Sequence, residues 1–186
     1  MKLTNKILLA AVMGLSSLGV MAQEEAALTV DSIPSINPKG IYLSNGKMCP
    51  EFSLKDFKGK TWTRDDFKGR YLVMDCWATW CSACIAKMPA YVELAKKYAG
   101  DERIQFITLS IDSRDAYKQW LYKLPKLGLL DFVNVIAPKS ESDFGEKFEL
   151  NAVPRYLIIG PDGKIVDFDA PSAHDGLAEI IENLLK

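Results

Sequence analysis

Residues 80–84 read Trp-Cys-Ser-Ala-Cys, directly after an apolar run and before a segment with helical spacing. Two thiols three positions apart at the start of a helix lie within bonding distance, so Cys81 and Cys84 can be oxidised to a disulfide and reduced again without refolding. Cys81 lies where unpaired backbone N–H groups and the helix dipole stabilise a thiolate, the nucleophilic form of the side chain. The pattern therefore predicts a redox-active dithiol.

The hydrophobic pattern around this dithiol predicts strands and helices in alternation. Strands are expected at 52–54, 60–63, 71–77, 104–111, 132–136, 156–159 and 165–168. Helices are expected at 65–67, as a single turn, and at 82–98, 115–124, 140–148 and after residue 175 up to Leu185. The strand at 71–77 is apolar almost throughout, which is typical of a strand covered on both faces. This order predicts an α/β fold with a mixed central sheet and helices on both faces.

Prolines and small polar residues predict where the helices bend, begin and end. Pro89 should kink the long helix after the dithiol, and Pro125 should end the next helix. Ser140 should begin the helix at 140–148 with Asp143 as its capping partner, and Ser172 to Asp175 should cap the last helix.

The first 22 residues carry the pattern of a signal peptide. Two lysines precede an apolar stretch at 7–20, and Ala22 ends a small-residue cleavage site. The apolar part is short for a bilayer span, although a retained membrane anchor is the alternative. We expect an extended arm at 23–39 and a single folded domain at 40–186. An exported chain of this kind belongs in the periplasm.

Charge and cysteine content narrow the class of protein. The formal net charge of −1 becomes −3 when the two leader lysines are removed, and the charges are scattered. We therefore expect no nucleic-acid or anionic-membrane partner, and a monomer. Four cysteines are too few for a disulfide scaffold in a chain of this length. Outside the cytosol thiols tend to be oxidised, so the close pair needs a chemical explanation.

Taken together, the motifs resemble the thioredoxin superfamily, specifically its exported TlpA/ResA-like branch, which is related to the AhpC/TSA proteins. The matching pieces are Cys-Pro-Glu-Phe-Ser-Leu at 49–54, Trp-Ala-Thr-Trp-Cys-Ser-Ala-Cys at 77–84, Met88-Pro89, Val153-Pro154 and Pro-Asp-Gly-Lys-Ile at 161–165. Their order extends from Met48 to the C-terminus. The resemblance implies a thioredoxin-like fold with an N-terminal β-hairpin extension and a helical insertion between Asp112 and Pro125.

In this reading Cys81 is the attacking nucleophile and Cys84 resolves the mixed disulfide. A permanent disulfide is the alternative, but so short a loop stabilises a fold little. A zinc site would need two more ligands, and no spacing of the remaining cysteines with His174 forms a second ligand pair. We therefore expect no metal and no cofactor.

An acid six residues before Cys81 is the expected proton acceptor. Asp75 lies within the apolar strand, so burial should raise its pKa. In thioredoxins the acid at the matching position assists deprotonation of the resolving cysteine, here Cys84. The alternative is a partly solvated residue at the strand end. Many members of the branch carry an acid three positions after the second cysteine, but this chain has Lys87 there. Asp75 is therefore the residue expected to carry out the proton transfer.

The resemblance also implies a groove for an extended client segment. Pro154 aligns with the superfamily's cis-proline, which faces the disulfide, although an ordinary proline at a strand start is the alternative. Val153 would offer backbone groups to the client strand. Trp80 and Thr79 would line the same groove.

The other two cysteines leave two readings open. A disulfide between Cys49 and Cys76 is conceivable in an oxidising compartment. The alternative is that Cys76 is a buried free thiol and that Cys49 is partly exposed.

The function expected is that of an exported thiol–disulfide oxidoreductase that reduces disulfide-containing client proteins, with apocytochrome c as one candidate client. A strong oxidant stabilises its reduced form by about 150 mV more than thioredoxin does, and neither Ser82 nor Ala83 supplies a cation for that. We therefore expect a reductant. The family resemblance implies that a membrane protein of the DsbD or CcdA type supplies its electrons. The alternatives are a thiol peroxidase, since Thr79 precedes Cys81 by two although the required proline is missing, and a redox-inactive binding or metallochaperone module.

Overall fold

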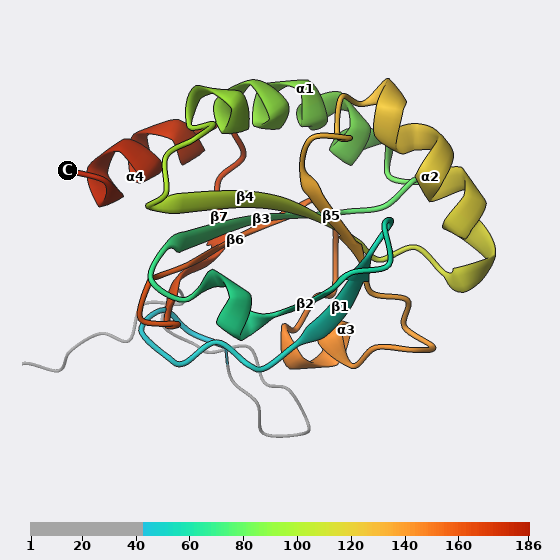
Figure 1. Ribbon diagram of the computed structural model, residues 1–186, viewed down its shortest axis with the longest axis horizontal. Coiled ribbons are helices and arrows are strands. Elements are labelled where there is room, and N and C mark those ends of the chain that lie inside the picture. The colour runs from blue at the N-terminus through green and yellow to red at the C-terminus, as the bar shows by residue number, and fades with distance from the viewer. Residues whose placement is uncertain (1–42) are drawn as a thin grey trace, which may run out of the picture. The chain divides into compact units, whose positions relative to one another are not determined.

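The computed structural model describes residues 43–186, and the expected signal peptide and extended arm lie outside this part of the chain. Seven strands form one sheet in the order β2-β1-β5-β4-β3-β6-β7 (Figure 1). They are β1 (Ser53–Asp56), β2 (Thr61–Thr63), β3 (Tyr71–Trp77), β4 (Ile104–Ser110), β5 (Val133–Ile136), β6 (Arg155–Ile159) and β7 (Ile165–Ala170).

The sheet is mixed, as the sequence predicts. Strands β3, β4 and β5 are parallel, while the β1–β2 and β6–β7 hairpins join them in antiparallel fashion. The register pairs Trp77 at the end of β3 with Ser110 at the end of β4. Because parallel strands end at the same edge of a sheet, the segments that follow β3 and β4 are neighbours.

Helices cover both faces of the sheet (Figure 1). Helices α1 (Ser82–Lys97), α2 (Tyr117–Lys126) and α4 (Leu177–Leu184) lie on one face, and α3 (Phe144–Lys147) lies on the other. Within residues 43–186, two 3-10 turns complete the order, η2 (Arg64–Phe67) and η3 (Arg114–Ala116). The expected single turn at 65–67 and the helical insertion before Pro125 are both present.

Strand β3 supplies side chains to both halves of the core, because successive side chains point to opposite faces. Val73 and Trp77 pack in the cluster that includes α1, whereas Met74 packs with Phe144 beneath the sheet. Each large apolar side chain buried in this way contributes roughly 1.5–3 kcal/mol. The burial on both faces makes β3 a rigid base for the loop that carries the two cysteines.

Helix α2 continues past the point where the sequence predicted its end. Pro125 lies inside the last turn, and the Leu127 N–H donates to the carbonyl oxygen of Lys123 on the far side of it. The proline lacks only its own N–H, so the helix ends at Lys126 instead of Leu124. Pro89 likewise lies inside α1, which runs through it to Lys97.

The last two helices begin later than predicted. The carbonyl oxygen of Pro138 accepts hydrogen bonds from the N–H groups of Glu141 and Ser142, which forms a separate turn before α3. Asp143 occupies the N-cap position of α3 but makes no side-chain cap bond. The expected cap at 172–175 is also a turn, and Gly176, at φ 129°, is the N-cap residue of α4.

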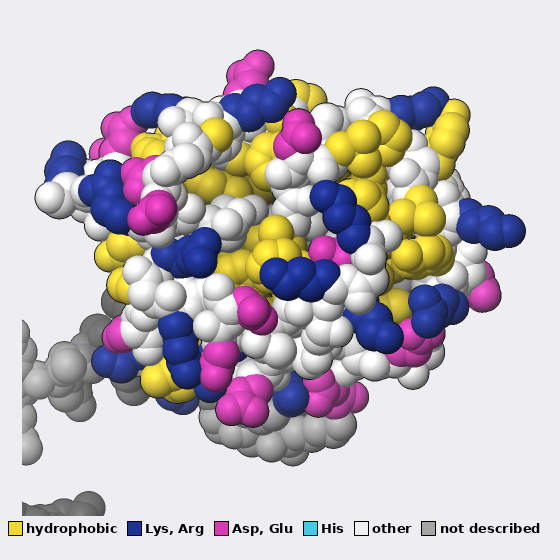
Figure 2. Space-filling model, viewed as in Figure 1, with side chains coloured by type: hydrophobic (Ala, Val, Ile, Leu, Met, Phe, Trp, Pro, Cys, Tyr) yellow, Lys and Arg dark blue, Asp and Glu magenta, His cyan; other side chains and the backbone are white. Residues whose placement is uncertain are grey.

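The surface carries mixed charge. On the face in Figure 2, Lys and Arg side chains alternate with Asp and Glu, and hydrophobic side chains lie between them. Exposed ion pairs such as Lys97–Glu182 follow from this mixture, and each stabilises the fold little. In residues 43–186 no helix is long and apolar enough to cross a bilayer.

Candidate redox site at the start of helix α1

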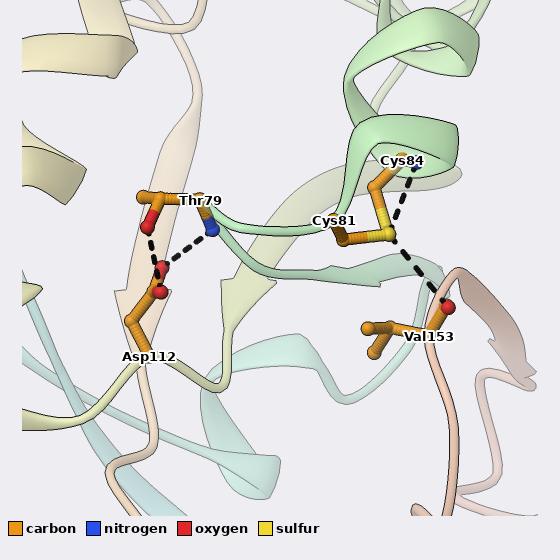
Figure 3. Close-up of a disulfide and its surroundings, with 5 residues drawn as sticks. All are labelled: Thr79, Cys81, Cys84, Asp112 and Val153. Carbon is orange, nitrogen blue, oxygen red and sulfur yellow. Dashed lines mark hydrogen bonds between the residues drawn. A yellow bond between two sulfur atoms is a disulfide. The ribbon is translucent and has the colours of Figure 1, made fainter.

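Cys81 and Cys84 form a disulfide where β3 gives way to α1, with their Cα atoms 5.3 Å apart. Cys81 is the N-cap residue of the helix, and the Cys84 N–H donates to its Sγ atom at 3.1 Å (Figure 3). This bond gives one of the free N–H groups of the first turn a partner, as capping side chains do. It would also stabilise negative charge on the same sulfur after reduction.

The two sulfurs differ in accessibility. Cys81 is 7% exposed, whereas Cys84 is 1% exposed and packs in the core beneath α1. Trp80, which precedes Cys81, is 67% exposed. Of the two cysteines, Cys81 is therefore the more accessible.

The loop before β6 approaches the disulfide from the other side. The Val153–Pro154 peptide bond is cis, as the resemblance implied. The Val153 carbonyl oxygen lies 3.7 Å from the Cys81 Sγ atom (Figure 3), and both Val153 and Pro154 are half-buried. The geometry thus brings Trp80, Cys81, Val153 and Pro154 to one surface.

Asp75 lies within β3 and is completely buried, so the reading of a partly solvated strand end is wrong. Its neighbours along β3, Val73 and Trp77, face α1, and Tyr156 lies directly opposite on β6. Neither carboxyl oxygen has a hydrogen-bond partner within residues 43–186. Burial without a counter-charge raises the pKa of Asp75 to about 8. The group can therefore gain or lose a proton near neutral pH.

Lys87, three positions after Cys84, makes an ion pair. Its Nζ atom donates to Asp175 Oδ2 at 2.9 Å and to Ser172 Oγ at 3.2 Å. The Ser172 hydroxyl and Lys87 together hold the pKa of Asp175 below its usual range. The cation thus links α1 to the turn that precedes α4.

Cys49 and Cys76 are free thiols, so the disulfide considered between them is absent. Cys49 is fully buried, and the expectation of partial exposure is wrong. Its N–H donates to the Gly163 carbonyl oxygen, which holds the segment before β1 against the β6–β7 turn. Burial raises the pKa of Cys49 to about 12 and that of Cys76 far above its usual value, so both thiols should be inert.

One buried acid near the site was not singled out from the sequence. Asp112 follows β4, and its carboxylate accepts hydrogen bonds from the Thr79 N–H at 2.9 Å and the Thr79 hydroxyl at 2.8 Å (Figure 3). A third comes from the Ser110 hydroxyl at 2.8 Å. Thr79 is consequently buried and faces Asp112. The available signal was an acid directly after a buried strand that runs parallel to β3.

No metal centre accompanies these groups in the described part of the chain. Across residues 43–186, no three His, Cys, Asp or Glu side chains are grouped so that they could hold a metal ion. The groups of this region with acid–base or redox chemistry include the sulfurs of Cys81 and Cys84 and the buried carboxyl group of Asp75.

A mixed sheet with a Cys-x-x-Cys disulfide at the first turn of α1 and a cis-proline beside it defines a thioredoxin-like dithiol protein. The sequence model of the AhpC/TSA family matches residues 45–168. The chain belongs to this family.

Three similar proteins carry the assignment further. The chain is 40% identical over 149 residues to the thiol:disulfide interchange protein DsbE of Vibrio cholerae, covering 75% of each chain. It is 39% identical over 129 residues to the thioredoxin-like protein YneN of Bacillus subtilis, covering 69% of this chain and 73% of the other. A solved thiol-disulfide oxidoreductase of Bacteroides fragilis superposes with a TM-score of 0.65 at 25% identity, covering 74% of this chain and 99% of that one. The protein is accordingly a thiol-disulfide oxidoreductase.

Proposed function

We propose that this oxidoreductase works outside the cytoplasm as a reductant of disulfides in other proteins, with Cys81 as its nucleophile. The observation that carries the proposal is the position of Cys81, at the helix N-cap, next to exposed Trp80 and less deeply buried than Cys84. Cys84, one turn further in and almost fully buried, then resolves the intermediate.

The exchange proceeds in two balanced steps. The Cys81 thiolate attacks one sulfur of the client disulfide, the client S–S bond breaks, and the departing client sulfur takes up a proton. Deprotonated Cys84 then attacks Cys81 Sγ, which releases the second client thiol and leaves the Cys81–Cys84 disulfide. Two electrons pass from the protein to the client, and a dithiol donor must return them before the next cycle.

Asp75 is proposed to accept the proton of Cys84 in the second step. Support comes from its position on the α1-facing side of β3, its complete burial and a pKa of about 8. A base whose pKa lies near the working pH is well matched to proton transfer. Because Lys87 is engaged by Asp175, it does not compete for this task.

The client is proposed to bind as an extended segment across the surface formed by Trp80, Val153 and Pro154. Trp80 offers a large exposed apolar face beside the reacting sulfur. Backbone groups at Val153 can pair with an extended strand, which tolerates many client sequences. Such a surface suits a reductant of unfolded or partly folded proteins, among which apocytochrome c is one candidate.

Export and electron supply complete the proposal. The basic and apolar pattern of the first 22 residues favours transfer to the periplasm, where reduced cysteines need a continuing electron source. A membrane dithiol protein of the DsbD or CcdA type has the required chemistry. Between the cysteines, Ser82 and Ala83 supply no cation to stabilise the thiolate, which favours a low, reducing potential.

Trapping tests the proposal directly. In Cys84→Ser the mixed disulfide on Cys81 cannot be resolved, so mass spectrometry of protein purified from periplasmic extract should find clients bound at Cys81. The double variant Cys81→Ser/Cys84→Ser is the control and should trap none. Titration of the wild-type protein against glutathione buffers tests the direction of electron flow. A reduction potential near that of DsbA would refute the proposal that the protein acts as a reductant.

A further inference from the structure

The loop between β3 and α1 is hydrogen-bonded to Asp112, a residue outside the Cys81–Cys84 pair. This loop, residues 78–81, must leave a buried strand and place Cys81 at the helix N-cap. Within it the Cys81 N–H donates to the Ala78 carbonyl oxygen at 3.1 Å. Its shortest hydrogen bonds to a side chain of another segment are those of Thr79 with Asp112, which follows β4, at 2.9 and 2.8 Å. Another side-chain contact of the loop, from the Cys81 Sγ atom to the Val153 carbonyl oxygen, is longer, at 3.7 Å.

Asp112 in turn depends on the position of the loop for its hydrogen bonds. Its carboxylate is fully buried and forms no ion pair with any residue of 43–186. Three neutral donors replace water around it, two of them from Thr79, and the third is the Ser110 hydroxyl. A displacement of the loop would leave a buried charge with one donor, which is strongly unfavourable.

We propose that Asp112 is a positioning residue for thiol–disulfide exchange: by holding Thr79 it keeps Cys81 at the N-cap, within reach of Cys84. The consequence concerns the close approach of the two sulfurs. A loop held at Thr79 keeps the Cys81 thiol near Cys84 in the reduced protein, so the effective concentration of one thiol toward the other stays high. This property sets how readily the internal disulfide forms and hence how strongly the protein reduces its clients.

The equilibrium constant for forming the Cys81–Cys84 disulfide against glutathione measures this effect. A substitution that only weakens the fold does so in both redox states and leaves the constant unchanged. We expect Asp112→Asn to lower the constant about tenfold, which raises the potential by ~30 mV for a two-electron couple. Thr79→Val, which removes one donor but keeps the charge and the N–H, should lower it about threefold, and Thr79→Ser should restore it.

The chain offers a matched control for loss of a buried carboxylate. Asp56, in the β1–β2 hairpin, also accepts three hydrogen bonds from neutral donors: the N–H groups of Lys58 and Lys60 and the Trp62 indole N–H, each at 2.9 Å. Strand β1 is separated from β3 by β5 and β4. Asp56→Asn should therefore lower the thermal unfolding temperature without changing the equilibrium constant.

The outcomes separate the possibilities. A lowered constant in Thr79→Val that is restored in Thr79→Ser, with Asp56→Asn unchanged, supports the proposal. Because Thr79→Val keeps the charge of Asp112, such a result cannot come from loss of that charge alone. A Thr79→Val constant within twofold of wild type overturns the proposal, even if Asp112→Asn fails to fold, and so does an equal fall in Asp56→Asn. The inference rests on exchange through Cys81 and Cys84; failure of the wild-type protein to equilibrate would refute that exchange itself.

Discussion

The backbone N–H of Cys84 points at the Sγ atom of Cys81, 3.1 Å away, across the first turn of α1. The sulfur that is more exposed to solvent is therefore also the one that receives a hydrogen bond from the helix. The bond strengthens when the acceptor is charged, because a thiolate accepts more strongly than a neutral sulfur. The hydrogen bond from the helix and the difference in burial together distinguish Cys81 from Cys84.

In the reduced protein, Cys81 should ionise below the value of an ordinary thiol, about 8.5, because the free N–H groups of α1 stabilise its thiolate. Rates of iodoacetamide alkylation measured against pH, with mass spectrometry to locate the adduct, give its pKa. Cys49 and Cys76 serve as internal controls and should stay unmodified until the protein is unfolded, since both are buried. Alkylation of Cys81 with the pH profile of a free thiol would contradict this account.

Asp75 should make the fold less stable as the pH rises. Its carboxyl group ionises near 3.8 in an unfolded chain but near 8 in the folded protein. Between these values the folded state holds the proton more tightly, so the free energy of unfolding falls as the pH rises from about 4 to about 8. At pH 7 the loss is of the order of 4 kcal/mol.

Asp75→Asn removes the ionisation, so its free energy of unfolding should fall much less between pH 5 and pH 8 than that of the wild type. Urea unfolding of the oxidised proteins at both pH values measures the difference in slope. The same variant should release mixed-disulfide intermediates more slowly at neutral pH, because Cys84 loses its proton acceptor. Equal pH slopes in the two proteins would exclude a raised pKa for Asp75.

Two buried tyrosines on the same side of the sheet should respond differently to loss of the hydroxyl group. The Tyr91 hydroxyl lies 2.8 Å from the Ile107 carbonyl oxygen and 3.0 Å from that of Val73, whereas the buried Tyr156 hydroxyl has no partner among residues 43–186. Tyr91→Phe should cost about 1 kcal/mol in the free energy of unfolding. Tyr156→Phe should cost nothing, and it serves as the matched control. Equal losses in urea unfolding would show that the hydrogen bonds of Tyr91 do not matter.

Long, uniformly apolar or regularly periodic segments could be predicted from the sequence. Strand β3 agrees with the predicted 71–77 at both ends, and α1 and β4 agree within one residue. These segments can be predicted from their own residues, because a uniformly apolar run indicates a strand buried on both faces and a helical spacing of apolar residues indicates a helix. The dithiol is likewise a local feature, since its function needs only a helix start.

The features that were missed depend on groups distant in sequence. Asp112 meets Thr79 only because the parallel register sets the ends of β3 and β4 side by side. The burial of Cys49 depends on a backbone bond to Gly163, more than a hundred residues away. The late start of α4 follows from a left-handed glycine at Gly176, which competes with a plausible cap. The secondary-structure propensity of a local segment cannot predict contacts of this kind between residues distant in sequence.

Trp80 should matter for clients but not for the fold. Its side chain is 67% exposed, so Trp80→Ala should change the free energy of unfolding by less than about 0.5 kcal/mol. Loss of its apolar face should lower the rate of protein-disulfide reduction about tenfold, a typical cost for a tryptophan at the centre of a contact. Reaction with hydroxyethyl disulfide, which is too small to need the groove, should be unchanged.

Tyr122 provides the matched control for this prediction, because it is an aromatic residue of similar exposure, 61%, on α2. Tyr122→Ala should alter neither reaction, since the client surface is expected at Trp80, Val153 and Pro154. Initial rates of reduction of unfolded, disulfide-containing ribonuclease and of the small disulfide are compared for each variant. If Trp80→Ala slows both reactions equally, the tryptophan acts on the reactivity of Cys81 and not on client binding, because only a binding role separates large substrates from small ones.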